Sequence, residues 1–331
     1  MSTRNLDIIT IGSGTRDVFL KSARFKVVRD DRFSTGEAEC MALGTKIDIP
    51  DITFETGGGA TNSAVSFARF GYHTGIITRI GKSDSHSQDV LNTLKREGVD
   101  TSTIIRDAKH QTGYSTLLLT SAGERTILAH RGASAHFTTS DIPWSKLQSK
   151  WLYITSLAGN MSLLGRLLNH ANKKGIKVAC NPGTSELSHP AKKLFPLLRK
   201  LDIFFLNDLE AAALTGMPHT DEVGMLKKLG RALPGIVVIT AGKDGSFSCD
   251  NEYRFHSTNR PIRVLDTTGA GDAFGAGFVA AYMKREDIPY ALKVGTLNAE
   301  SVIQHIGAKP GLLRRFPSVE KIRVDKYRFP N

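Results

Sequence analysis

The sequence is poor in cysteine, and the three that it has, Cys40, Cys180 and Cys249, lie far apart. An odd number of cysteines without a C-x-x-C pair argues against a disulfide framework and against a zinc site. Such usage fits a reducing compartment. We therefore predict a cytoplasmic protein.

Long apolar runs and blocks of like charge are also missing. No run approaches the length that spans a membrane, and residues 1–7 lead into a strand too early for a signal peptide. Lysine and arginine outnumber aspartate and glutamate by 44 to 32, for a net charge of +12, but they are dispersed and no basic block carries interleaved aromatics. We expect neither a membrane nor a nucleic-acid partner, although a basic surface weakly attracts anionic nucleotides and sugar phosphates.

No linker, low-complexity run or internal repeat divides the 331 residues, 40% of which are hydrophobic. From residue 88 onward, helical and strand patterns alternate, which predicts a mostly parallel sheet with helices on both faces. We therefore expect one α/β domain over residues 1–331. The expected strands are 6–11, 151–154, 177–180, 202–206, 235–240 and 262–265, and the expected helices are 56–71, 88–97, 163–174, 209–214, 224–233 and 289–305.

Two segments outside this alternation predict short strands that project from the main body. Residues 18–54 contain strand-like pieces at 18–20, 25–28 and 46–50. Residues 114–119 and 125–130 form the arms of an expected β-hairpin that turns at residues 121–124. Together they predict a small separate β-sheet, built from about residues 16–54 and 112–132.

Two glycine-rich passages fail as nucleotide-binding fingerprints. After the first strand, Gly12-Ser-Gly14 begins a G-x-G-x-x-G pattern, but its third glycine would fall at Asp17 and no helix follows at once. Five residues instead of four separate Gly75 from Gly81, which rejects a P-loop. The first failure weakens the case for a dinucleotide-dependent oxidoreductase.

The stretch 266–283 leads from a turn containing Gly269 and Gly271 into an apolar, alanine-rich helix. A helix N-terminus has unpaired N–H groups and the positive end of the helix dipole, so an anion fits there. A carboxylate at Asp272 makes sense in this positive site if it accepts a proton from a hydroxyl while the N–H groups stabilise a transferring phosphoryl group. The alternative is an aspartate that only caps the helix.

The residues Asp266-Thr-Thr-Gly-Ala-Gly-Asp-Ala-Phe-x-Ala-Gly-Phe278 closely resemble the C-terminal signature of the ribokinase-like (PfkB) family of sugar and nucleoside kinases. The resemblance extends from residue 6 to about 311. It implies a three-layer α/β fold with a β-sheet lid that covers the sugar and often pairs with another subunit's lid, so a homodimer is expected. By resemblance, Asp272 is the general base, and the anion hole is formed by Gly269, Ala270 and Gly271.

The family's substrate-binding elements have counterparts nearer the N-terminus. Residues 56–71 resemble its N-terminal signature, in which Asn62 contacts a hydroxyl and the backbone touches the substrate at Gly57, Gly58 and Gly59. Helix capping with close packing is the plainer alternative. Asp17 stands where the family has an aspartate that binds substrate hydroxyls. The family's Gly-x-x-Asp element is matched by Gly81 and Asp84. The family usually has a glycine a few residues later, where this sequence has Ser87.

The resemblance also implies ATP and Mg²⁺. Asn207 and Glu210 match a motif that holds magnesium through water, and Mg²⁺ prefers oxygen ligands and keeps several waters. The same pair is otherwise commonplace at a helix start. The oxygens of Asp266 and Thr268 match ligands of a monovalent cation, so potassium is an expected activator. The matched nucleotide-site residues are Thr240 and Gly242 near the phosphates, Gly245 beneath the ribose or base, and Gly307 in the loop that closes the adenine side.

We therefore expect an ATP-dependent kinase that phosphorylates a hydroxyl of a small sugar, ribose-like or hexose. A nucleoside kinase of the adenosine or cytidine type and a sugar-acid kinase of the 2-keto-3-deoxygluconate type remain alternatives. A non-catalytic sugar-binding protein is disfavoured by Asp272. The lid residues Tyr114, Arg125 and Arg131 are the candidates for choosing the acceptor, although a lone hairpin arginine is more often simply solvated.

Overall fold

The computed structural model describes residues 6–33, 36–120 and 125–329. A nine-stranded sheet forms the centre of the main body, with the strand order β17-β16-β15-β14-β13-β12-β11-β1-β6. Neighbouring strands from β6 to β14 are parallel, and β14 to β17 pair antiparallel. The strands are β1 (Leu6–Ile11), β6 (Thr74–Ile77), β11 (Ser149–Ile154), β12 (Lys177–Cys180), β13 (Ile203–Asn207), β14 (Ile236–Thr240), β15 (Ser246–Cys249), β16 (Tyr253–Ser257) and β17 (Val324–Arg328).

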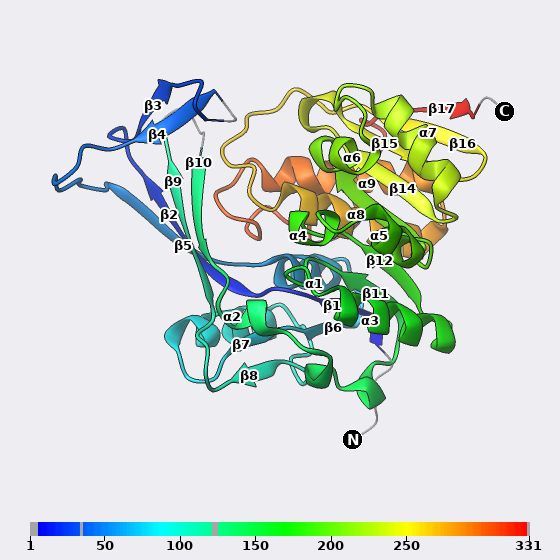
Figure 1. The fold of residues 1–331 in the computed structure, drawn as a ribbon, viewed down its shortest axis with the longest axis horizontal. Coiled ribbons are helices and arrows are strands. Elements are labelled where there is room, and N and C mark those ends of the chain that lie inside the picture. Colours follow the sequence, from blue (N-terminus) through cyan, green and yellow to red (C-terminus); the bar gives the residue numbers. More distant parts are fainter. Residues whose placement is uncertain (1–5, 34–35, 121–124, 330–331) are drawn as a thin grey trace.

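Helices cover both faces of this sheet, as Figure 1 shows. One face packs against α1 (Gly59–Arg69), α8 (Ala270–Arg285) and α9 (Ile288–Val302), with α2 (Ser85–Arg96) beside α1. The other face packs against α3 (Met161–Lys174), α5 (Ala191–Leu198), α6 (Asp208–Thr215) and α7 (Glu222–Ala232). The short α4 (Thr184–Leu187) lies between β12 and α5 in the chain.

The sheet contributes side chains to two hydrophobic cores, one on each of its faces. In β1, Ile8 packs into the core of α1 and α8, whereas Ile9 and Ile11 pack into the core of α3. Successive side chains of a strand point to opposite faces, and parallel strands buried on both faces are apolar throughout. The helix ends also follow local rules, since α3 starts at Asn160, whose side chain accepts a hydrogen bond from Leu163 N, and ends at the left-handed Gly175.

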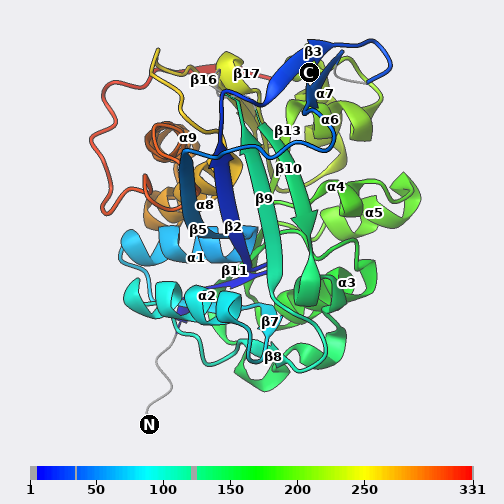
Figure 2. The ribbon, with the colours of Figure 1, turned by 90° about the vertical axis from the view of Figure 1, so that its left-hand side faces the viewer.

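A second sheet projects from the main body and forms the lid (Figure 1). Its order is β10-β9-β2-β5, and Figure 2 shows these strands side by side. They are β2 (Thr15–Lys21), β5 (Asp51–Gly57), β9 (Gly113–Leu119) and β10 (Arg125–His130), and β3 (Lys26–Arg29) pairs with β4 (Glu37–Cys40) at the tip. One face of the lid packs Phe19, Leu117 and Leu119 against Ile306 of the body. A further short pair, β7 (Arg79–Gly81) and β8 (Ile105–Asp107), lies below the lid.

Two local predictions were wrong, and one group of strands was missed. Residues 262–265 form no strand, and Val264 is 52% exposed, so its apolar character does not reflect burial. Residues 46–50 are also irregular, and the strand starts only at Asp51. The sequence pattern predicted only the parallel part of the sheet, and the antiparallel strands β15 to β17 were not predicted. The expected turn at residues 121–124 lies outside the described residues.

None of the helices in the described ranges is both long enough and apolar enough to cross a membrane. The expected alternation of helices and strands and the separate lid sheet are confirmed. In the parallel part of the sheet, polar residues collect at the carboxyl ends of the strands, which is where open α/β sheets bind ligands.

Candidate functional site

The start of α8 is an open helix N-terminus, although the N–H of Ala270, which was expected to bind the anion, is already hydrogen-bonded. Gly269 caps the helix with a φ of +77°, and a Cβ there would lie 2.3 Å from the Cβ of Ala308, so a side chain is excluded. A Cβ at Gly271 would meet no atom within 4 Å, so the space in front of the helix is open. The Ala270 N–H bonds to the Thr267 carbonyl, but within the part of the chain that the structure describes no acceptor faces the N–H of Gly271 or Asp272. These two groups are free to bind an anion.

The carboxylate of Asp272 lies beside this open space and is held by α1. The Asn62 side chain donates from Nδ2 to Oδ2 of Asp272 at 2.8 Å. Burial raises the pKa of Asp272, the bond from Asn62 and the charge of Lys309 oppose this rise, and the charge of Asp17 adds to it. A carboxylate with a raised pKa is a stronger base than an ordinary aspartate.

Lys309 joins this group although sequence reasoning missed it. It is only 3% exposed, and its ammonium donates to the Asn62 Oδ1 at 2.6 Å, to the Thr61 Oγ1 at 2.9 Å and to the Thr56 carbonyl. These acceptors lie 247 to 253 residues away in the sequence. No local pattern could have indicated the contact.

The glycines of the N-terminal signature allow close approach between chain segments. A Cβ at Gly57 would lie 1.8 Å from Oδ2 of Asp17, and a Cβ at Gly58, whose φ is +92°, would lie 2.5 Å from the Ser13 carbonyl oxygen. Asp17 is 7% exposed, and its Oδ1 accepts a bond from the Thr15 hydroxyl at 3.0 Å. Burial raises the pKa of Asp17, and the nearby Lys309 charge opposes the rise. The structure therefore brings Asp17, Asn62 and Asp272 together around Lys309.

A pocket of about 210 Å³ opens at the base of the lid. It lies on the same lid face as Asp17, because Thr15 is two positions before Asp17 and Ser115 is its register partner on β9. Its lining consists mainly of hydroxyl-bearing residues with one guanidinium, namely Ser13, Thr15, Ser115, Ala129, His130, Arg131, Ser134, Ser156 and Ala158.

Of the three lid residues expected to choose the acceptor, only Arg131 lies at this pocket. Arg131 lines the pocket, and within the described ranges its guanidinium makes no hydrogen bond or ion pair. Tyr114 lies on the opposite face of β9, and its ring is 4.8 Å from that of His86 on α2, so Ser115 takes the place expected for Tyr114. The alternation of side chains along a strand could have indicated Ser115. Arg125 instead contacts the Thr267 hydroxyl in the loop before the anion-binding helix start.

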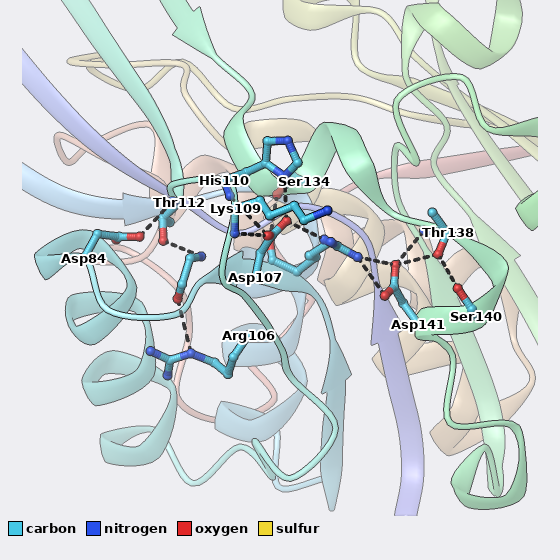
Figure 3. Close-up of polar contacts among 12 residues, drawn as sticks. Asp84, Arg106, Asp107, Lys109, His110, Thr112, Ser134, Thr138, Ser140 and Asp141 are labelled. Atoms are coloured by element: carbon cyan, nitrogen blue, oxygen red, sulfur yellow. Dashed lines mark hydrogen bonds and ion pairs between the residues drawn. The ribbon is translucent and has the colours of Figure 1, made fainter.

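The expected Gly-x-x-Asp element supports the base of the lid (Figure 3). Asp84 caps α2 by accepting from Ser87 N at 2.7 Å, and it also accepts from Thr112 N at 3.0 Å. Thr112 in turn accepts from Gly81 N at 3.0 Å, just before β9 begins. Ser87, which stands where the resemblance expects a glycine, fits as a residue of the first helical turn. Its hydroxyl donates to the Asp84 carbonyl at 2.7 Å.

An ion-pair network continues from this element to the pocket floor. The Arg79 guanidinium bonds to Asp107 at 2.8 Å and to Asp141 at 2.7 Å, and the Arg79 carbonyl accepts from the pocket residue Ser134 at 3.3 Å (Figure 3). The pKa of Asp107 is held well below its usual range by the bonds from Arg79, Lys109 and His110, against the opposing effect of burial. These contacts hold the pocket residue Ser134 in place.

The expected nucleotide residues gather at the carboxyl ends of β13 and β14. Asn207 and Thr240 are register partners in the two strands. Gly242 follows with a φ of +49°, and a Cβ at Gly245, whose φ is +91°, would lie 2.1 Å from the Ser257 carbonyl oxygen. Parallel-strand ends of this kind form the usual ligand crevice of an open α/β sheet.

The pair Asn207 and Glu210 forms a reciprocal helix cap at the start of α6. Glu210 N donates to the Asn207 Oδ1 at 2.7 Å, and Asn207 N donates to the Glu210 Oε2 at 2.9 Å. Burial raises the pKa of Glu210. The described residues contain no cluster of three or more His, Cys, Asp or Glu side chains that could hold a metal by themselves. Among the described residues, none donates to Oε1 of Glu210, so the pair fits Mg²⁺ held largely by waters and phosphates.

Asp266 ties the anion-binding loop to the C-terminal loop. It is 2% exposed, its Oδ1 accepts from the Thr268 N–H at 2.9 Å and the Thr268 hydroxyl at 2.7 Å, and its Oδ2 accepts from Gly307 N at 2.9 Å. No ion pair reaches this carboxylate from the described part of the chain. A buried carboxylate without a counter-charge fits a bound cation.

The chain is similar to known sugar and nucleoside kinases. A family model described as pfkB family carbohydrate kinase matches residues 32–314. The chain is 29% identical to the ribokinase of Haemophilus influenzae over 269 residues, which cover 80% of this chain and 86% of that protein. It is 25% identical to the nucleoside kinase of Methanothermobacter thermautotrophicus over 257 residues, covering 77% and 81% of the two.

Among solved structures, the chain resembles Arabidopsis thaliana ribokinase complexed with ribose and ATP. The TM-score is 0.77 at 21% identity, and the match covers 93% of this chain and 96% of that one. The expected ribokinase-like fold is thereby confirmed.

Proposed function

Because the chain belongs to the pfkB family of carbohydrate kinases, we propose that it transfers the γ-phosphate of ATP to a hydroxyl of a small sugar, ribose-like or hexose. The family makes it a phosphotransferase that acts on a sugar hydroxyl. The observation that carries the proposal is the position of Asp272 beside two free N–H groups and open space at the start of α8.

In this proposal each residue has one task. Asp272 accepts the proton of the acceptor hydroxyl through Oδ1, because Oδ2 already accepts from Asn62. The N–H groups of Gly271 and Asp272 bind the phosphoryl oxygens as charge builds on them. Gly269 and Ala270 shape the turn that exposes these groups. Mg²⁺ near Asn207 and Glu210 would supply charge neutralisation of the ATP phosphates.

Asp17 is the proposed ligand of the other sugar hydroxyls. Asn62 has one amide proton left for the substrate, since Oδ1 faces Lys309 and the other proton goes to Asp272. On the nucleotide side, we propose that Thr240 and Gly242 lie near the phosphates, and that Gly245 and Gly307 lie near the ribose and base.

The pocket favours a polar acceptor over a nucleoside. Among the residues that the structure describes, its lining contains no phenylalanine, tyrosine or tryptophan to stack on a base. Of the phenylalanines in and beside the lid, Phe19, Phe25 and Phe137 are at most 5% exposed and belong to the interior, whereas Phe33 is 50% exposed. Arg131 supports a second candidate, a sugar acid or sugar phosphate, because a planar guanidinium binds carboxylate or phosphate well.

The deciding measurement is kcat/KM with saturating MgATP for ribose, fructose, 2-keto-3-deoxygluconate, adenosine and cytidine. A free sugar is expected to be the best acceptor. A tenfold advantage for a nucleoside, about 1.4 kcal/mol of transition-state binding, would contradict the proposal. A preference for the acid that disappears in Arg131→Met, while Arg125→Met retains it, would instead establish the second candidate.

A further inference from the structure

Lys309 occupies a loop that is held in place by the anion-binding loop on one side and by α1 on the other. The preceding Ala308 packs against Gly269, and Gly307 donates its N–H to Asp266. On the other side, the Arg69 guanidinium of α1 donates to the Lys309 carbonyl at 2.8 Å. The backbone is therefore fixed on both sides, and the Lys309 side chain points from it into the space between α1 and the lid strands.

The Lys309 ammonium uses all three of its protons on protein oxygens, those of Thr56, Thr61 and Asn62. An ammonium can only donate hydrogen bonds. The side-chain amide of Asn62 must therefore turn its oxygen toward Lys309, which leaves the amide nitrogen directed at Asp272.

We propose that Lys309 is a positioning residue for phosphoryl transfer, which acts by fixing the orientation of the Asn62 amide so that Oδ1 of Asp272 is the oxygen presented to the acceptor hydroxyl. The inference rests on the proposed kinase function. Without the ammonium, the Asn62 amide could flip and place its oxygen against the carboxylate. Repulsion between the two oxygens would then turn Asp272 away from the acceptor.

Charges on every neighbouring element act on this lysine. Asp17 of β2, Glu55 of β5 and Asp272 of α8 stabilise the ammonium, and Arg69 of α1 opposes it. Burial is the dominant effect and lowers the pKa of Lys309 to about 8. The ammonium is thus present below about pH 8 and is lost as the pH rises through that value. The neutral amine has two protons for three acceptors and can itself accept, so it no longer forces the Asn62 oxygen to face it.

The test is the pH dependence of kcat in the wild type, Lys309→Met and Lys309→Arg, with the exposed Lys173→Met as control. The wild type and the control are expected to lose kcat as the pH rises through about 8. Lys309→Met is expected to lower kcat roughly 10- to 100-fold at pH 7, to leave KM for ATP within about threefold, and to lack this alkaline limb. Lys309→Arg, which keeps a permanent charge, should restore part of kcat and also lack the limb.

A double-mutant cycle with Asn62→Ala separates positioning from general damage. If Lys309 acts through Asn62, the Lys309→Met change should cost less than about threefold in kcat once Asn62 is removed. Additive losses, or an unchanged alkaline limb in Lys309→Met or Lys309→Arg, would overturn the inference while leaving the kinase function intact. If Lys309→Met does not fold, the inference is still tested by whether the wild type has the alkaline limb of kcat and Lys309→Arg lacks it. A wild type inactive on every acceptor would remove the proposed function and the inference together.

Discussion

At the residue scale, the environment of Asp272 decides both its reactivity and its pH range. Its pKa is raised mainly by burial, and a base must be ionised to accept a proton. Activity should therefore fall as the pH falls through a value above the ordinary 3.8 of an aspartate. This acid limb and the alkaline limb from Lys309 would together give a bell-shaped profile.

Asp272→Asn keeps the shape of the side chain and removes only its ability to accept the proton. We expect kcat to fall roughly 10²- to 10⁴-fold while nucleotide affinity stays within a few-fold. Steady-state kinetics and a nucleotide titration measure the two effects. The matched control is Asp221→Asn, because Asp221 also caps a helix but lies at the start of α7. Retention of more than about a tenth of wild-type kcat in Asp272→Asn would show that Asp272 is not the base.

Gly57→Ala tests the substrate role of Asp17 without changing its charge. The added Cβ would lie 1.8 Å from Oδ2 of Asp17, so the carboxylate must move. We expect kcat/KM for the acceptor to drop at least about tenfold, the worth of a hydrogen bond to a charged group, with KM for ATP little changed. Gly165→Ala is the control, since its Cβ would meet Leu197 at an ordinary 3.5 Å. Equal effects on both substrates would argue against a role of Asp17 in acceptor binding.

At the element scale, the loop before α8 depends on one buried carboxylate. Asp266 bonds to Thr268 and Gly307 but has no counter-charge in the described ranges. We propose a monovalent cation here, and we predict that potassium raises kcat in a buffer that lacks sodium and potassium. Asp266→Asn should abolish the response, because the buried negative charge is removed. A wild-type rate that does not change on adding potassium chloride, with choline chloride as the ionic-strength control, would contradict the site.

We propose that the outer face of the lid forms the expected dimer contact. Several apolar side chains on its outer face are half exposed, including Ile52 at 52%, Phe54 at 54% and Leu128 at 57%. Burying such a face against a second lid would stabilise a dimer. We predict a dimer by light scattering, and we predict that Ile52→Asp combined with Leu128→Asp gives a monomer. Leu209→Asp on α6, where Leu209 is 64% exposed, should leave the dimer intact. A monomeric wild type would exclude the lid contact.

At the scale of the whole molecule, the lid and the body are built from alternating segments of the chain, and both contribute residues to the proposed site. The chain passes between body and lid several times, and both contribute residues that face Lys309. We therefore predict a single calorimetric unfolding transition, shifted to higher temperature by MgATP because the ligand binds only the folded state. Resolved transitions for lid and body would contradict the single domain of residues 1–331.

Local patterns were enough to predict most of the helices and strands and the two glycine-rich signatures. The alternation of helices and strands, the hairpin arms and the helix start at Gly269 depend on residues close together in the sequence, which is why they could be predicted. The strand expected at residues 262–265 was wrong because an exposed apolar run has the same composition as a buried one. The antiparallel strands β15 to β17 were missed because pairing direction depends on how the chain returns to the sheet.

The sequence by itself therefore determined the family, the fold and the identity of Asp17, Asn62 and Asp272 as candidate site residues, since each lies within a local pattern. Only the tertiary structure decided what surrounds them. Lys309 reaches its partners across about 250 residues of sequence, and Ser115 rather than Tyr114 faces the pocket because of the strand register. The orientation of the Asn62 amide, and with it the free oxygen of Asp272, follows from an ammonium that becomes a neighbour only when the chain folds.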